Sequence, residues 1–198
     1  MKMVSLDLTF TNTTDGPMKK ICMGEKKSQQ GIEIHEFPEI PTLASNTSTS
    51  ALMAIDFNDT TQPAQFQVCF NNTKRFMVSI TAPVGELLQP NMLSENDFLA
   101  LKGKLTGMNE NTSNVDLPPT DNTDQAIIDA IYRAANVLQI PSSQGGVYYY
   151  AGKTAAAGVD VLVTIKVTEH KAAVTVNCER MVVGSMLVKA IKSSLLES

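Results

Sequence analysis

The stretch PVGELLQPNMLSENDF, residues 83–98, separates two kinds of hydrophobic pattern and decides the predicted fold. Before it, apolar and polar residues alternate, as at Phe66 and Val68. Side chains on a strand point alternately to opposite faces, so this period of two predicts strands with one buried face. Within the stretch a helix begins, because Ser94 is a good N-cap residue and Asp97 stands at the capping-box position. The sequence therefore predicts an all-β half followed by a half with helices and strands.

The first half contains six strand-like segments with turn-forming residues between them and no helical pattern. These segments are residues 2–12, 19–24, 31–37, 49–57, 65–71 and 74–81. Pro38 to Pro41 is interpreted as a break, and Asn71-Asn72 as a two-residue hairpin turn, since Asn tolerates positive φ. Short strands at regular intervals predict a β-sandwich over residues 1–83.

The second half, residues 84–198, predicts an antiparallel sheet with helices packed on it, an α+β layer. Helical periodicity marks residues 94–104, 123–138 and 181–196, and strand patterns mark residues 114–117, 147–151, 159–168 and 172–179. The apolar pair Leu87-Leu88 lies in the segment between the two halves. We expect it to be buried at a fixed interface, because a free linker would not carry such residues.

Composition excludes several classes of function. A net charge of −4 without clustered Lys and Arg argues against nucleic acid as a partner. No apolar run approaches the roughly 18 residues of a membrane span, so no direct membrane insertion is expected. Cys22, Cys69 and Cys178 have no disulfide-framework or metal-ligand spacing, and reduced thiols indicate a cytoplasmic chain. A first strand close to Met1 indicates a fragment of a longer polypeptide.

No catalytic motif appears in the sequence. His35 and His170 are far apart and have no Cys, His or Glu at ligand spacing. The acidic residues are scattered, and no pair stands out for acid–base chemistry. We therefore expect a protein that is not an enzyme and that uses no metal or other cofactor.

Three of the four tyrosines stand in a row at residues 148–150. On a strand, Tyr149 must face one side of the sheet and its two neighbours the other. Either both faces of the sheet are covered, or at least one ring is exposed. The first alternative is ordinary sheet packing; the second is an aromatic anchor for a bound peptide.

Several ordered motifs carry a resemblance to a known family. They are KMVSLDLTFTNTTD (2–15), MGEKK (23–27), PVGELLQP (83–90) and LTGMNE (105–110). Together they resemble the C-terminal appendage, or ear, of the beta subunit of adaptor protein complex 3, a beta-adaptin, over almost the whole chain.

The resemblance implies an immunoglobulin-like β-sandwich followed by an α+β platform. It also implies a non-enzymatic role in vesicle-mediated protein transport toward lysosomes and related organelles. The expected partners are short linear peptide motifs of trafficking accessory proteins or coat proteins, together with other adaptor subunits reached through the full-length chain. The expected location is cytoplasmic, peripheral on Golgi and endosomal membranes and coated vesicles.

Related beta subunits of clathrin adaptors grip peptides on the platform with a tryptophan and a tyrosine. Alignment at Phe98 places Lys102 at the tryptophan position, and this chain contains no tryptophan. Tyr149 takes the tyrosine position, while Thr164 and Asn177 stand where those relatives carry charged residues. The resemblance thus implies a peptide site between the helix over 94–104 and the strand of Tyr149, with a preference for acidic ligands because Lys102 adds a positive charge.

Two alternatives remain open at this point. The domain could be an intramolecular regulatory dock that holds the adaptor hinge or trunk in a closed state. A two-domain extracellular adhesion fragment would instead need paired cysteines and glycosylation at the Asn-x-Ser/Thr triplets, of which Asn12 begins the first.

Overall fold

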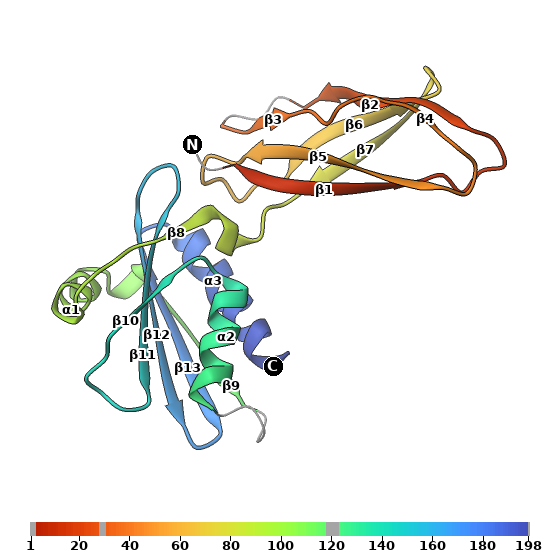
Figure 1. The fold of residues 1–198 in the computed structure, drawn as a ribbon. Coiled ribbons are helices and arrows are strands. Elements are labelled where there is room, and N and C mark those ends of the chain that lie inside the picture. The colour runs from red at the N-terminus through yellow and green to blue at the C-terminus, as the bar shows by residue number, and fades with distance from the viewer. Residues whose placement is uncertain (1–2, 28–30, 118–122, 198) are drawn as a thin grey trace. The chain divides into compact units, whose positions relative to one another are not determined.

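The computed structural model describes residues 3–27, 31–117 and 123–197. It separates into two compact units, Met1–Ala82 and Pro83–Ser198 (Figure 1). Both are built mainly from antiparallel sheets, and the second also carries three α-helices among its described residues. None of the described helices is long and apolar enough to cross a membrane.

The first unit contains two antiparallel sheets whose strands alternate between buried and exposed side chains. The three-stranded sheet has the order β1-β5-β3, and the four-stranded sheet has the order β4-β2-β6-β7. The alternation is regular in β1, where every second residue is partly buried and its neighbours are exposed. The strands are β1 (Val4–Thr11), β2 (Met18–Lys26), β3 (Glu33–His35), β4 (Ile40–Leu43), β5 (Ser48–Asp56), β6 (Ala64–Phe70) and β7 (Lys74–Ile80).

The six strands expected in this unit are present, and the structure adds a seventh. The expected break at Pro38 to Pro41 is wrong in part, because Ile40–Leu43 forms strand β4. This strand pairs only with β2 and lies at the edge of its sheet, where a proline is tolerated. Lys2, the first residue of the first expected strand, lies outside the described residues.

The asparagine turn also differs in length from the prediction. Asn71 and Asn72 both have positive φ, 53° and 61°, as expected for a tight hairpin. Because Phe70 pairs with Lys74, the turn contains three residues rather than two.

The second unit is a sheet of order β10-β11-β12-β13-β9, with the short strand β8 pairing with β11 as well. All of its pairings are antiparallel. Its elements are η1 (Val84–Leu87), β8 (Leu88–Pro90), α1 (Glu95–Lys104), η2 (Gly107–Asn109), β9 (Glu110–Asp116), α2 (Asp124–Ala134), β10 (Leu138–Ile140), β11 (Val147–Thr154), β12 (Asp160–Thr168), β13 (Lys171–Cys178) and α3 (Met181–Leu196).

Helices cover both faces of this sheet (Figure 1). On one face, α1 contributes Phe98 to an apolar cluster with Tyr149 and Leu162 of the sheet. On the other face, α2 and α3 pack on a larger cluster that contains Tyr150 and Val163. The tyrosine row therefore follows the first alternative, in which both faces are covered.

The start of α1 and the whole of α3 agree with the sequence prediction. Ser94 is the N-cap of α1, and its Oγ accepts the N–H of Asp97 at 3.2 Å. Helix α3 spans residues 181–196, as expected. Strand β9 begins at Glu110, earlier than the expected 114, and β8 was not expected from the sequence.

The helix predicted over residues 123–138 is too long. Helix α2 ends at Ala134, the next residue is extended (φ −157°, ψ 145°), and Leu138 lies in β10. The N–H of Asn136 donates instead to the carbonyl of Gly85, at 3.3 Å. A contact with a segment some fifty positions earlier therefore ends the helix. The spacing of apolar residues near residue 134 does not indicate this contact.

The segment with Leu87 and Leu88 belongs to the second unit. Both side chains are buried, 4% and 0% exposed. Leu88 joins the larger apolar cluster, and the carbonyl of Leu87 accepts the N–H of Ala155 at 2.9 Å. Burial of the pair is confirmed through contacts inside the second unit, whereas the fixed interface between the two halves stays a prediction.

The close approach of Gly85 to the end of α2 gives a first prediction. A Cβ at Gly85 would lie 2.1 Å from the carbonyl oxygen of Ala134 and 2.7 Å from the Cα of Ala135. Since both atoms are backbone, Gly85→Ala should destabilise the second unit by about 1–3 kcal/mol. The matched control is Gly103→Ala in α1, where a Cβ meets nothing within 4 Å. That change should stabilise by up to about 1 kcal/mol.

Tyrosine fluorescence during urea unfolding measures this effect. All four tyrosines lie at residues 132–150 and the chain has no tryptophan, so the signal reports on the second unit. A Gly85→Ala variant as stable as wild type would contradict the role assigned to this contact.

Candidate functional site

The five residues predicted for a peptide site come together on one side of the second unit. Phe98 and Lys102 lie on α1, Tyr149 on β11, Thr164 on β12 and Asn177 on β13. The register pairs Tyr149 with Thr164 and Leu162 with Asn177, so the sheet residues share the face that α1 covers.

Phe98 and Tyr149 form the apolar part of this contact. Their ring centroids are 4.7 Å apart and the rings are tilted by 32°. Phe98 is 0% exposed and Tyr149 is 6% exposed. Tyr149 is thus packed beneath the helix, and its ring does not offer a flat wall to a ligand in this structure. The expectation of an accessible aromatic ring at this position is wrong, because α1 lies directly on β11.

Asn177 links the end of α1 to strand β9. Its side chain is 0% exposed, and its Nδ2 donates to the carbonyl of Leu105 and, at 3.1 Å, to Oε2 of Glu110. These bonds satisfy the buried amide N–H groups and fix the chain that leaves the helix. The residue therefore positions α1 on the sheet.

Lys102 closes the polar edge of the α1 contact. Its Nζ donates to Oγ1 of Thr164 at 2.9 Å, and Thr164 is 1% exposed. Burial, followed by the positive charge of Lys166, lowers the pKa of the Lys102 ammonium. An anionic group bound beside these two lysines would offset both effects.

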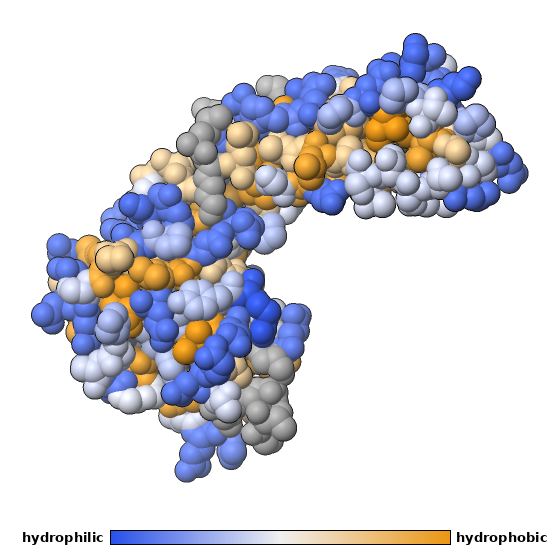
Figure 2. Space-filling view, in the orientation of Figure 1, coloured by the Kyte–Doolittle hydropathy of each residue, from blue (hydrophilic) through white to orange (hydrophobic). Residues whose placement is uncertain are grey.

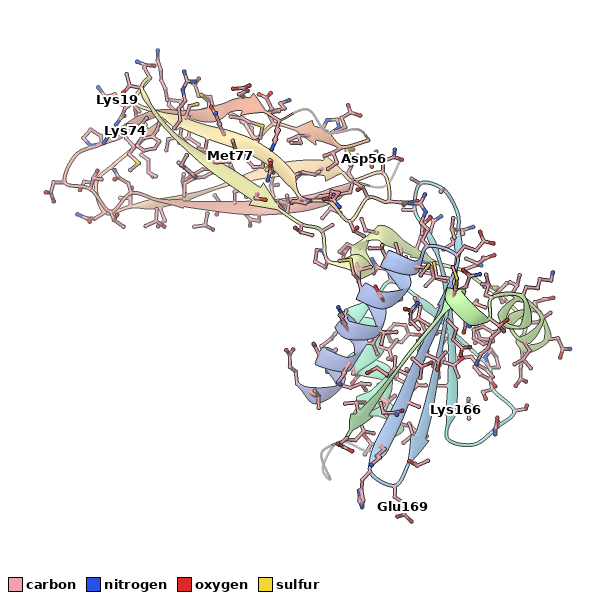
Figure 3. The ribbon with its side chains drawn as sticks, turned by 180° about the vertical axis from the view of Figure 1, so that it is seen from behind. Lys19, Asp56, Lys74, Met77, Lys166 and Glu169 are labelled. Atoms are coloured by element: carbon pink, nitrogen blue, oxygen red, sulfur yellow. The ribbon has the colours of Figure 1, made fainter. Side chains whose placement is uncertain are left out.

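The part of the sheet face next to Lys102 is polar and open. Lys166, two residues after Thr164 on β12, is exposed, and it makes no ion pair among the described residues (Figure 3). A cavity of about 460 Å³ lies at this end of the sheet, near the β12–β13 turn that carries Glu169. It is lined by Asn114, Val115, Asp116, Lys166, Thr168, Lys171 and Ala173.

This open face presents ammonium, amide and hydroxyl groups. Thr112 and Thr175 extend it, with their hydroxyl oxygens 3.0 Å apart. At its outer end, Nζ of Lys171 lies 3.7 Å from Oδ1 of Asp116. Asp116 thus pairs with Lys171, and the positive charge of Lys166 has no acidic partner among the described residues. Sequence reasoning missed Lys166, although its spacing from Thr164 places both on one face of a strand.

Other candidate chemical groups remain dispersed. His35 is exposed on β3, with Nε2 at 3.6 Å from Oε1 of Glu33, and His170 is exposed in the β12–β13 turn. Within residues 3–27, 31–117 and 123–197, no three His, Cys, Asp or Glu side chains are grouped to hold a metal ion.

Comparison with known proteins gives consistent matches. Residues 85–195 match the family described as the AP-3 complex subunit beta-1, C-terminal domain. Residues 1–62 match a second family, described as the C-terminal part of the clathrin-adaptor complex-3 beta-1 subunit.

Individual relatives match nearly the whole chain. The AP-3 complex subunit beta-2 of Mus musculus is 43% identical over 196 residues, or 98% of this chain. The AP-3 complex subunit beta-1 of Homo sapiens is 40% identical over 195 residues. The chain spans 18% of the length of each of these two relatives. The AP-3 complex subunit beta of Dictyostelium discoideum is 31% identical over 85 residues, which are 43% of this chain and 8% of that protein.

The buried position of Tyr149 generates a second prediction. Tyr149→Ala removes a packed ring from between α1 and the sheet, and should destabilise the second unit by roughly 3 kcal/mol or more. Tyr149→Phe keeps the stack on Phe98 and should remain close to wild type. Urea unfolding followed by far-ultraviolet circular dichroism distinguishes the two variants. Equal stability of Tyr149→Ala and wild type would mean that α1 does not depend on this contact.

Proposed function

This chain belongs to the family of C-terminal domains of AP-3 complex beta subunits, and we propose that it acts as a non-enzymatic protein-interaction appendage. In this role it recruits accessory or coat proteins during vesicle-mediated transport to lysosomes and related organelles. The observation that carries the proposal is the similarity to AP-3 beta subunits, which extends over 98% of the chain.

We propose the following organisation for the appendage. Residues 1–83 form an immunoglobulin-like β-sandwich and residues 84–198 form the platform. The two antiparallel sheets of the first unit support the first assignment, and the helix-covered sheet of the second unit supports the other. The appendage works at the cytoplasmic surface of Golgi and endosomal membranes, and other adaptor subunits associate with it through the full-length chain.

Peptide motifs of partner proteins bind the platform on the open face beside α1. The buried residues Phe98, Tyr149, Thr164 and Asn177 hold the helix in place on the sheet. Lys102 then contacts the ligand together with Lys166. Two ammonium groups with no aromatic wall between them favour acidic side chains, because opposite charges attract across a partly desolvated surface. Such motif contacts are typically micromolar, about −8 kcal/mol.

A charge-reversal experiment tests the proposal. In the Lys102→Glu, Lys166→Glu double variant, like charges would face an acidic ligand, so capture of trafficking proteins from cytosol should fall more than tenfold. The matched control is Lys189→Glu with Lys192→Glu, which makes the same change of charge on α3, on the other face of the sheet. Immobilised variants are compared by quantitative mass spectrometry, after urea unfolding has shown that each is folded.

Each result has a defined meaning. Equal losses in both double variants would indicate a general effect of charge and would contradict the platform site. The intramolecular alternative predicts a different result: a longer chain that includes the preceding hinge would capture less than the 198-residue chain. That outcome would mean that the main role of the domain is to dock internally and not to recruit other proteins.

A further inference from the structure

The first unit has a groove along the edge of β5, with a volume of about 660 Å³. One side is the outer face of the three-stranded sheet, and the other is the chain segment that leads from β3 to β4. Its lining residues are Asp7, Pro38, Glu39, Ile40, Pro41, Ser50, Ala51 and Leu52. In Figure 2, apolar surface (orange) interrupts the hydrophilic surface of this unit.

The edge of β5 in this groove is unpaired. Strand β5 pairs with β1 from Ser48 to Ile55. On its other side β3 pairs only with Ala54, Ile55 and Asp56, and no other described strand joins this sheet. Alternate N–H and C=O groups of residues 48–53 therefore face the groove without a strand partner, which is the arrangement that accepts an added strand.

The opposite wall is held in position before any ligand arrives. Phe37, 4% exposed, precedes it and packs on the ring of Phe10 with centroids 5.1 Å apart. Ile40 pairs with Ile21 of β2. Pro38 lies between these anchors and Pro41 follows the second one; each fixes its backbone φ and removes one N–H donor from the wall. A preformed wall lowers the entropic cost of binding an extended segment.

The side chains of the groove combine apolar surface with negative charge. Leu52 is 69% exposed, although it lies in the middle of a strand. Asp7 is its direct partner in the β1–β5 register, so both side chains lie on one face. Glu39 stands on the opposite wall. Neither carboxylate makes an ion pair among the described residues, and no Lys, Arg or His lines the groove.

We propose that this groove binds an extended segment of a partner protein that carries an apolar side chain flanked by Lys or Arg. The segment adds as a strand to the edge of β5, its apolar side chain covers Leu52, and its cations pair with Asp7 and Glu39. This site lies within the first unit and is independent of the platform site. It selects basic ligands, whereas the platform site selects acidic ones.

A designed peptide tests the proposal. In STRTFTRTS, the two Arg and the Phe point to one face of a strand, because they are two residues apart. Fluorescently labelled peptide should bind the 198-residue chain saturably below about 1 mM. Amide hydrogen exchange should slow at residues 48–53. STETFTETS and STRTATRTS serve as charge and anchor controls, and each should bind at least several-fold more weakly.

Variants of the chain locate the binding. Leu52→Thr should weaken STRTFTRTS binding roughly tenfold through lost apolar contact. Asp7→Asn with Glu39→Gln should weaken it roughly threefold to tenfold and reduce its salt dependence. Met77→Thr is the control for Leu52, because Met77 is 58% exposed on β7 (Figure 3). Glu25→Gln, at an exposed position of β2, is the control for charge. Neither control should change the affinity.

Three outcomes would overturn the proposal. The first is no saturable binding of STRTFTRTS up to about 1 mM, and the second is equal binding of STETFTETS. The third is self-association of the chain in sedimentation that Leu52→Thr abolishes, since this would assign the groove to a second copy of the chain.

Discussion

The arrangement of the second unit depends on burial of one sheet from both faces. Strand β11 carries three consecutive tyrosines, and such a row on a strand must present rings to both sides. Helix α1 covers Tyr149, while α2 and α3 pack on the cluster that contains Tyr150. Because α1 covers only part of its face, the sheet beyond it remains polar and open around Lys166. The position of α1 thus determines both the burial of Tyr149 and which part of this sheet face stays open.

The identity of most elements could be predicted from the sequence, since local physics determines them. Alternation predicted six of the seven described strands of the first unit, and the Ser94 cap predicted the start of α1. Two of the errors, at β4 and at the end of α2, share one cause, which is contact between distant segments. Strand β4 contains a proline and exists because β2 pairs with it, and α2 ends early where Gly85 meets Asn136. The spacing of apolar residues along the sequence reveals neither of these two contacts.

The candidate site follows the same division. The family resemblance placed five residues, and the structure brings all five together where α1 packs on the sheet. The exposure of the Tyr149 ring could not be predicted in this way, because it depends on how closely α1 approaches the sheet. A gap between α1 and β11 would make Tyr149 an anchor, whereas direct packing makes it part of the core. The same residue type at the same aligned position is therefore part of the core here. In our proposal, the ammonium groups beside it contact the ligand instead.

The two proposed surfaces differ in their physics as well as in their position in the chain. On the platform, desolvation and a neighbouring lysine lower the pKa of Lys102, so a carboxylate ligand relieves an existing electrostatic cost. In the groove of the first unit, Asp7 and Glu39 are exposed, and the backbone of β5 supplies the main attraction. Salt should therefore weaken contacts to the exposed carboxylates more than contacts to the partly buried lysine. A partner with one basic extended segment and one acidic motif would gain avidity from both, without either contact being strong alone.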